Sequence, residues 1–229
     1  MIKVYALPCA GGTSSMYFNM AKNNTDEVHI VPIELAGRGQ RFSESLYHDF
    51  SDMVKDIFHI ISNKITDEDY ALFGHSMGGY LIYELCCMLK SNHFKMPKHL
   101  FLASVSPPNF RSKFKKVGGE LNDEELLSFV IDIGGIPPEV AANKDFENIF
   151  FPIIKSDFQN LNKYKPTALT RLHINITTLY GSKDYLVLEH ISEWKQYTLN
   201  KFEGIKFEGN HFFINHNPKQ IYKIIEERV

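Results

Sequence analysis

Short apolar runs recur along the chain, and they alternate with longer stretches in which apolar residues return every three or four positions. The short runs are typical of buried strands. They cover residues 2–7, 28–35, 70–73, 99–106, 172–180 and 205–208. The longer stretches predict helices, which we expect at about residues 45–63, 80–90, 188–197 and 218–227. Strands that alternate with helices in this way predict an α/β fold, with a mostly parallel sheet covered by helices on both faces.

The pattern changes between residues 107 and 166, where no strand-like alternation occurs. Asn122 or Asp123 is expected to cap a helix, and Phe146–Tyr164 carries a second helical pattern. We interpret this region as a helical insertion, a lid over the strand ends, within one domain of residues 1–229. The alternative is a helical excursion of the scaffold that gates nothing.

A basic run lies where the insertion begins. Its members are Arg111, Lys113, Lys115 and Lys116. The run is either a solvated loop or a docking patch for an acidic protein partner.

Composition narrows the class of protein. Hydrophobic residues make up 44% of the chain and charged residues 23%, and the formal net charge is −2, which favours a globular protein and gives no reason to expect nucleic acid or a membrane surface as partner. The cysteines are Cys9, Cys86 and Cys87, an odd number with two adjacent members, which favours a reducing cytoplasm over a disulfide framework. The histidines show no metal-ligand spacing, and no apolar run reaches the roughly 18 residues of a membrane span. We expect no metal and a monomer.

The segment Gly74–Gly79 reads Gly-His-Ser-Met-Gly-Gly and stands between a predicted strand and a predicted helix. Strand, Gly-x-Ser-x-Gly and helix together indicate a nucleophile elbow, in which Ser76 occupies a sharp turn at a helix N-terminus. Gly74 and Gly78 leave room where strand and helix crowd each other. The alternative is a glycine-rich turn with an idle serine.

Two further residues complete a catalytic pattern. Asp184 follows a strand and a glycine turn, and His211 follows the last predicted strand. The chain order Ser76, Asp184, His211 is that of the α/β-hydrolase fold. In such a triad Ser76 is the nucleophile, His211 transfers protons, and Asp184 orients the imidazole.

Three other residues compete for these roles. His75 adjoins the nucleophile, but at this position in the chain its side chain is expected to point away from the Ser76 hydroxyl. This favours a supporting or packing role. His216 lies in a predicted loop, so His211 is the better base. Asp157 lies at the end of the insertion, so Asp184 fits the strand-and-turn position better.

The backbone is expected to bind the oxyanion. One N–H comes from Met77, the residue after the nucleophile, and the other from the loop after the first strand, at Cys9 or Ala10. Gly11 and Gly12 allow this loop to approach a reacting carbonyl. The Cys9 thiol has no recognisable base near it in sequence, so we assign it a packing role.

The chain resembles the stand-alone type II thioesterases of nonribosomal peptide and polyketide synthesis. The resembling segments are Leu7–Gly12, Glu34–Phe42, Gly74–Gly79, Phe151–Phe158, Gly181–Asp184 and Gly209–Phe212. The loop Gly37–Phe42, Gly-Arg-Gly-Gln-Arg-Phe, is the most discriminating of them. Cys9 and Lys155 depart from the family, which often has another residue at the first position and arginine at the second.

The resemblance implies a substrate and a partner. The substrate is an acyl or aminoacyl group on the phosphopantetheine thiol of an acyl or peptidyl carrier domain, and the task is editing by hydrolysis. The enzyme itself then needs no cofactor. The chain begins at its first strand and stops after its last helix, so we expect a discrete protein. The alternatives are a general serine esterase acting on oxygen esters, a medium-chain thioesterase of fatty acid synthase, and a catalytically silent carrier-binding module.

Overall fold

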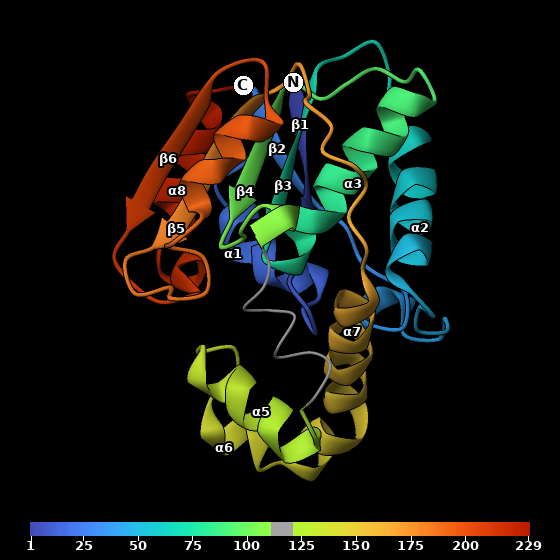
Figure 1. Cartoon of the computed structure of the whole chain (residues 1–229), viewed down its shortest axis with the longest axis vertical. Coiled ribbons are helices and arrows are strands. Elements are labelled where there is room, and N and C mark those ends of the chain that lie inside the picture. Colours follow the sequence, from blue (N-terminus) through green and yellow to red (C-terminus); the bar gives the residue numbers. More distant parts are fainter. Residues whose placement is uncertain (111–120) are drawn as a thin grey trace.

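The computed structural model describes residues 1–110 and 121–229 (Figure 1). Its strands are β1 (Ile2–Leu7), β2 (Val28–Pro32), β3 (Tyr70–His75), β4 (His99–Ala103), β5 (Asn175–Gly181) and β6 (Phe202–Phe207). They form one six-stranded sheet in the order β2-β1-β3-β4-β5-β6. Every neighbouring pair is parallel, so the predicted parallel sheet is confirmed.

Helices connect and flank these strands. The α-helices are α1 (Phe18–Ala21), α2 (Phe50–Ser62), α3 (Met77–Ser91), α5 (Asp123–Asp132), α6 (Pro138–Ala141), α7 (Phe151–Lys163) and α8 (Pro218–Glu226). The short 3-10 helices are η1 (Ser14–Tyr17), η2 (Gly39–Arg41), η3 (Pro108–Phe110), η5 (Ile191–Tyr197) and η6 (Phe213–His216), and η4 (Phe146–Phe150) is a π-helix.

Both faces of the central strands of the sheet are buried. On β1, Tyr5 and Leu7 join the apolar cluster that contains α2 and α3, which lie side by side (Figure 1). The alternate residues Val4 and Ala6 join the cluster that contains α1 and α8. Because successive side chains of a strand point to opposite faces, a strand buried on both faces has a continuous apolar sequence. This explains why the central strands appear in the sequence as unbroken apolar runs.

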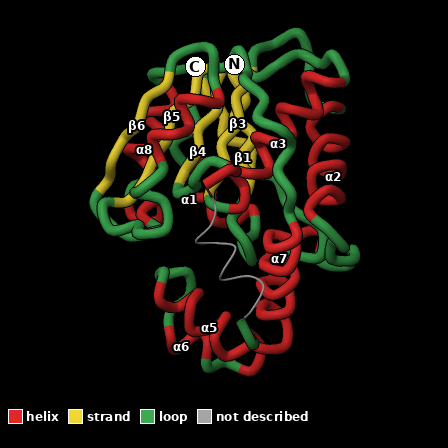
Figure 2. The backbone as a smooth tube through the Cα atoms, in the orientation of Figure 1, coloured by secondary structure: helices red, strands yellow, loops and turns green. Residues whose placement is uncertain are grey.

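The connection from β4 to β5 carries α5, η4, α6 and α7, which gather beyond the carboxyl ends of the strands (Figure 2). Asn122 caps α5: its side chain accepts from the Glu125 N–H at 3.0 Å, and the Glu125 carboxylate accepts from the Asn122 N–H at 2.8 Å. A separate apolar cluster holds α5, η4 and α7 together, and Ala10 from the loop after β1 packs against it. The basic run at residues 111–116 lies outside the described residues.

Several element boundaries differ from the predictions. Helix α2 begins at Phe50, not near residue 45, because the Asp49 side chain caps it by accepting from the Asp52 N–H at 2.9 Å. The strand predicted over residues 28–35 ends at Pro32. The helix predicted near residues 188–197 is the 3-10 helix η5. Within the described residues no helix is long and apolar enough to cross a bilayer, and no cluster of side chains has the composition of a metal site.

Candidate active site

Ser76 occupies the turn between β3 and α3. Its φ of 54° and ψ of −114° lie in a region that non-glycine residues rarely adopt. Its N–H donates to the Ala103 carbonyl at 2.8 Å, which ties the turn to β4. A Cβ at Gly74 would lie 2.3 Å from the Gly78 carbonyl oxygen, so only glycine fits there. The turn thus places Ser76 directly before Met77, the first residue of α3, at the positive end of the helix dipole.

His211 and Asp184 form a buried pair. The Nδ1 atom of His211 lies 2.9 Å from Oδ2 of Asp184, and both side chains are almost fully buried. Burial acts to raise the pKa of Asp184, but the charge of His211 and the hydrogen bond to it outweigh burial, so the pKa lies below its usual value. The ionised carboxylate holds the proton of His211 on Nδ1, which leaves Nε2 as the nitrogen that can take up a proton.

The backbone of His211 is tied to the turn that carries Ser76. Its carbonyl oxygen lies 2.9 Å from Nε2 of His75 and accepts a hydrogen bond from Oγ of Ser104, also at 2.9 Å. The His75 and His211 ring centroids are 5.2 Å apart. Although β4 and β5 separate β3 from β6 in the sheet, the loop after β6 therefore reaches back to the residue next to Ser76.

His75 is an uncharged member of this group. Burial, helped by the neighbouring charge of His211, lowers the pKa of His75 to about 3. A carbonyl oxygen only accepts hydrogen bonds, so Nε2 of His75 carries the proton and donates it to His211. Sequence reasoning assigned His75 a supporting or packing role, and the structure shows which atom it supports.

The loop Pro8–Gly12 adjoins the start of α3. A Cβ at Gly78 would lie 2.2 Å from the Leu7 carbonyl oxygen, so the first turn of α3 touches the end of β1. The backbone N–H groups of Met77 and Ala10 donate no hydrogen bond to any described residue. They are therefore available to a bound oxygen atom.

The buried Cys9 side chain is part of the core. Burial, together with the negative charge of Asp157, raises the pKa of the Cys9 thiol to about 12. A thiol with so high a pKa stays protonated and is a weak nucleophile. These properties fit a packing residue.

The structure separates two of the three competing residues, Asp157 and His216, from the group around His211. Asp157 forms a bidentate ion pair with Arg38, with distances of 2.5 and 2.8 Å, and lies on α7 rather than beside His211. His216 is exposed at the end of η6. Sequence reasoning assigned no role to Arg38 or Ser104. The one local feature that could have drawn attention to Arg38 is its position between two glycines.

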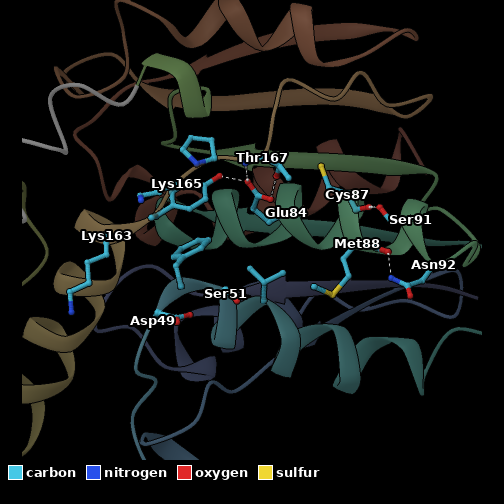
Figure 3. A pocket seen from close by; sticks show the side chains of 14 residues that line it. Asp49, Ser51, Glu84, Cys87, Met88, Ser91, Asn92, Lys163, Lys165 and Thr167 are labelled. Atoms are coloured by element: carbon cyan, nitrogen blue, oxygen red, sulfur yellow. Dashed lines mark hydrogen bonds between the residues drawn. The ribbon is translucent and has the colours of Figure 1, made fainter.

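A cavity of about 810 Å³ lies between α2, α3 and the segment after α7 (Figure 3). On its wall, Glu84 accepts hydrogen bonds from the Tyr164 hydroxyl and from the Thr167 backbone N–H and hydroxyl. None of the three candidate catalytic residues lines this cavity. It is therefore separate from the site around Ser76.

Comparison with known proteins decides the family. Residues 2–229 match the model of the thioesterase domain. The chain belongs to the thioesterase family. Its members are hydrolases of thioesters, so this thioesterase is an enzyme of that class.

Solved structures support this assignment. The structure of ClbQ from the colibactin NRPS/PKS pathway superimposes with a TM-score of 0.91 at 31% identity, covering 99% of this chain and 96% of ClbQ. RedJ, a thioesterase from the prodiginine biosynthetic pathway in Streptomyces coelicolor, gives a TM-score of 0.91 at 27% identity, covering 100% and 90% of the two chains. The α/β-hydrolase fold and the resemblance to type II thioesterases of NRPS/PKS pathways are thereby confirmed.

A second group of relatives comes from fatty acid synthesis. The medium-chain S-acyl fatty acid synthase thioesterase of Rattus norvegicus is 28% identical over 218 residues, which cover 93% of this chain and 82% of the relative. Both groups are thioesterases, so the reaction class is common to them.

Proposed function

We propose that this thioesterase is a stand-alone editing enzyme. It hydrolyses acyl or aminoacyl thioesters from the phosphopantetheine arms of acyl or peptidyl carrier domains in nonribosomal peptide or polyketide synthesis. Ser76 is the nucleophile, His211 the general acid and base, and Asp184 the residue that orients His211. The similarity to ClbQ and RedJ, both from biosynthetic pathways of this kind, supports the choice of substrate.

One observation carries the assignment of roles. The His211–Asp184 pair is joined through the His211 carbonyl to His75, whose neighbour Ser76 stands in a strained turn at a helix N-terminus. An ionised, buried Asp184 keeps His211 in the tautomer that a general base needs. This pair supports the proposal, because a histidine held in this way can activate a serine hydroxyl, which is a weak nucleophile on its own.

The reaction then proceeds in two halves. The Ser76 oxygen attacks the thioester carbonyl carbon while its proton passes to Nε2 of His211. The C–S bond then breaks, and His211 gives the proton to the departing sulfur, so that pantetheine leaves as the thiol. Water next attacks the acyl-Ser76 ester and gives a proton to His211. The acid departs as the ester bond breaks, and the proton returns to Ser76.

The backbone N–H groups of Met77 and of Ala10 or Cys9 hold the negative oxygen that forms in each half. The close approach of Gly78 to Leu7 supports this assignment, because it brings the start of α3 next to the end of β1. Each such donor typically contributes about 2.7–4 kcal/mol of transition-state stabilisation.

The decisive experiment loads a carrier protein with acetyl-phosphopantetheine and follows its mass after the enzyme is added. Wild type should remove the acetyl group, whereas Ser76→Ala and His211→Ala should remain folded and show no turnover. His216→Ala is the matched control, because His216 is an exposed histidine of the same loop region and should not be needed.

A nitrophenyl ester assayed in parallel separates the alternatives. Cleavage of the ester with the acyl carrier left intact would identify a general esterase. The similarity to the rat enzyme favours one second candidate, a medium-chain thioesterase of fatty acid synthase. Acetyl-carrier and decanoyl-carrier substrates distinguish it, since a medium-chain enzyme prefers the decanoyl group and an editing enzyme also removes the acetyl group.

A further inference from the structure

The carboxylate of Asp157 joins helix α7 to the loop after β1. Its Oδ2 atom accepts a hydrogen bond from the Gly11 backbone N–H at 2.8 Å and also contacts Nη1 of Arg38 at 2.5 Å. Its Oδ1 atom accepts from Nη2 of Arg38 at 2.8 Å. Both oxygens of one carboxylate are thus committed to the loop and to the arginine that stands beside it.

Arg38 completes the attachment from the other side. Its Nη1 atom also lies 3.4 Å from the Gly12 carbonyl oxygen, and its Nε lies 3.4 Å from the Ala36 carbonyl oxygen. The Arg38 and Asp157 side chains are 0% and 1% exposed. Asp157 therefore accepts a hydrogen bond from the Gly11 N–H, and Arg38 donates one to the Gly12 C=O. These two groups lie on either side of the peptide unit that joins Gly11 to Gly12.

Packing adds a second contact between α7 and the loop. Gly11 has a φ of +70°, and a Cβ there would lie 2.3 Å from Cγ1 of Ile154, one turn before Asp157 on α7. Ala10 packs against the same apolar cluster of the insertion. The loop is consequently enclosed between α7 on one side and the start of α3 on the other.

We propose that Asp157 and Arg38 are positioning residues for the oxyanion site. By holding Gly11 and Gly12, they fix the orientation of the preceding peptide units, so that an N–H of the loop faces the reacting carbonyl together with Met77. This inference rests on the proposed function. It also makes the position of α7, a helix of the insertion, a determinant of catalytic rate.

A purely structural role would give a different result on mutation. A buried ion pair is a poor source of net stability, and replacing both partners with apolar residues often leaves stability unchanged, whereas removing one partner leaves a buried charge. The informative variants are therefore double variants in which neither charge remains.

The test compares Arg38→Met/Asp157→Leu with Arg38→Met/Asp157→Asn. The asparagine oxygen can still accept from the Gly11 N–H, whereas leucine cannot. Lys155→Gln is the matched control, because Lys155 is on the same helix and pairs with Asp123 at an exposed position away from the loop. For each variant we would measure thermal unfolding, kcat and KM on an acyl carrier and on a nitrophenyl ester, and inhibition by an alkyl boronic acid.

With leucine at residue 157, we expect kcat to fall at least about tenfold on both substrates while KM changes little. Binding of the boronic acid, whose tetrahedral anion occupies the oxyanion site, should weaken in parallel. The asparagine variant should recover part of both losses at an unchanged unfolding temperature, and Lys155→Gln should behave as wild type.

Equal kcat values in two folded double variants, or a kcat that follows only the unfolding temperature, would overturn the proposal. If only the asparagine variant folds, the proposal is refuted when this variant binds the boronic acid as tightly as wild type but has a reduced kcat. The ester and boronic acid readings keep this test separate from the proposed function, since they remain measurable even if wild type leaves acyl carriers untouched.

Discussion

The Nε2 atom of His75 donates a hydrogen bond to the backbone carbonyl oxygen of His211, 2.9 Å away. The residue before the proposed nucleophile thus holds the backbone of the proposed general base, across the two strands that separate them in the sheet. Because burial lowers the pKa of His75 to about 3, this donor is neutral near neutral pH and keeps its direction there.

Removal of this hydrogen bond should slow catalysis without unfolding the enzyme. In His75→Phe an aromatic ring is retained and the Nε2–H donor is lost, whereas the His211 carbonyl oxygen keeps its hydrogen bond from Ser104. We expect kcat to fall roughly 10- to 100-fold, because small displacements of catalytic groups have effects of this size. KM should change little. Steady-state kinetics on an acyl carrier, with circular dichroism as a check of folding, measure this.

Ser104→Ala provides the comparison, since the Ser104 hydroxyl donates to the same oxygen at 2.9 Å. Each single variant leaves one donor, so the double variant should lose more activity than either. An unchanged kcat in His75→Phe would show that His211 is positioned by other contacts, and the hydrogen bond would then be incidental to catalysis.

Gly78→Ala should disturb the proposed oxyanion site from the side of α3. The new Cβ would lie 2.2 Å from the Leu7 carbonyl oxygen and 2.8 Å from that of Pro8, and backbone atoms cannot move aside as a flexible side chain does. Forced insertion of a methyl group into a packed region typically costs about 1–3 kcal/mol. We expect a lower unfolding temperature and a loss of Ser76-dependent hydrolysis.

Gly204→Ala is the matched control on the sheet edge. A Cβ there would meet Thr178 Oγ1 at 3.4 Å, an ordinary contact, and Gly204 is exposed. This variant should retain wild-type activity. Full activity in Gly78→Ala would mean that the start of α3 can move away from β1 without cost, and Met77 would then be a doubtful oxyanion donor.

The sequence located the candidate site residues within the fold better than it located the helix boundaries. Ser76, Asp184 and His211 each follow a strand, and parallel strands bring their carboxyl ends to one edge, so local signals were enough to place these residues near one another. The observed contact between Asp184 and His211 follows from that topology. A strand pattern and a turn residue are short-range signals, which a single sequence contains.

The predicted boundaries of helices and strands were wrong where a capping residue or a tertiary contact determines where the element begins. The start of α2 depends on the Asp49 cap, which the apolar stripe from Phe50 indicated only indirectly. Strand β6 begins at Phe202, earlier than the predicted residue 205, because its pairing with β5 is a backbone interaction that an exposed edge sequence containing Glu203 and Gly204 does not reveal.

The pair Arg38–Asp157 was beyond prediction for a different reason. Its members lie 119 positions apart, in a loop and in an inserted helix, and no periodicity relates them. Asp157 instead appeared as a competitor for the third triad position. Only the fold shows that α7 lies against the loop after β1. There Asp157 binds the Gly11 N–H and is not the acid that pairs with His211.

His99 lies at the start of β4, at the opposite end of this strand from the site. Its Nε2 is 2.8 Å from the Thr177 hydroxyl oxygen, and its ring stacks on Phe101 at 4.3 Å. Burial, helped by the positive charge of Arg228, lowers the pKa of His99 to about 4. The unfolded chain, with a histidine pKa near 6.5, therefore binds a proton that the folded chain does not bind between about pH 6.5 and 4.

The sign of the effect follows from this difference. Since the unfolded state binds more protons in that window, the contribution of His99 to the free energy of unfolding is fully present above about pH 6.5. It is lost as the pH falls toward 4, by up to about 1.4 kcal/mol per pH unit.

Urea unfolding of His99→Gln across this range should show a shallower decline of the free energy of unfolding than wild type, whereas the exposed His173→Gln should keep the wild-type slope. The three proteins carry the same carboxylates, so the difference in slope reports the loss of His99 together with its charge interaction with Glu203. Parallel curves for wild type and His99→Gln would mean that His99 is protonated in the folded protein, with its charge accommodated between Thr177 and Phe101.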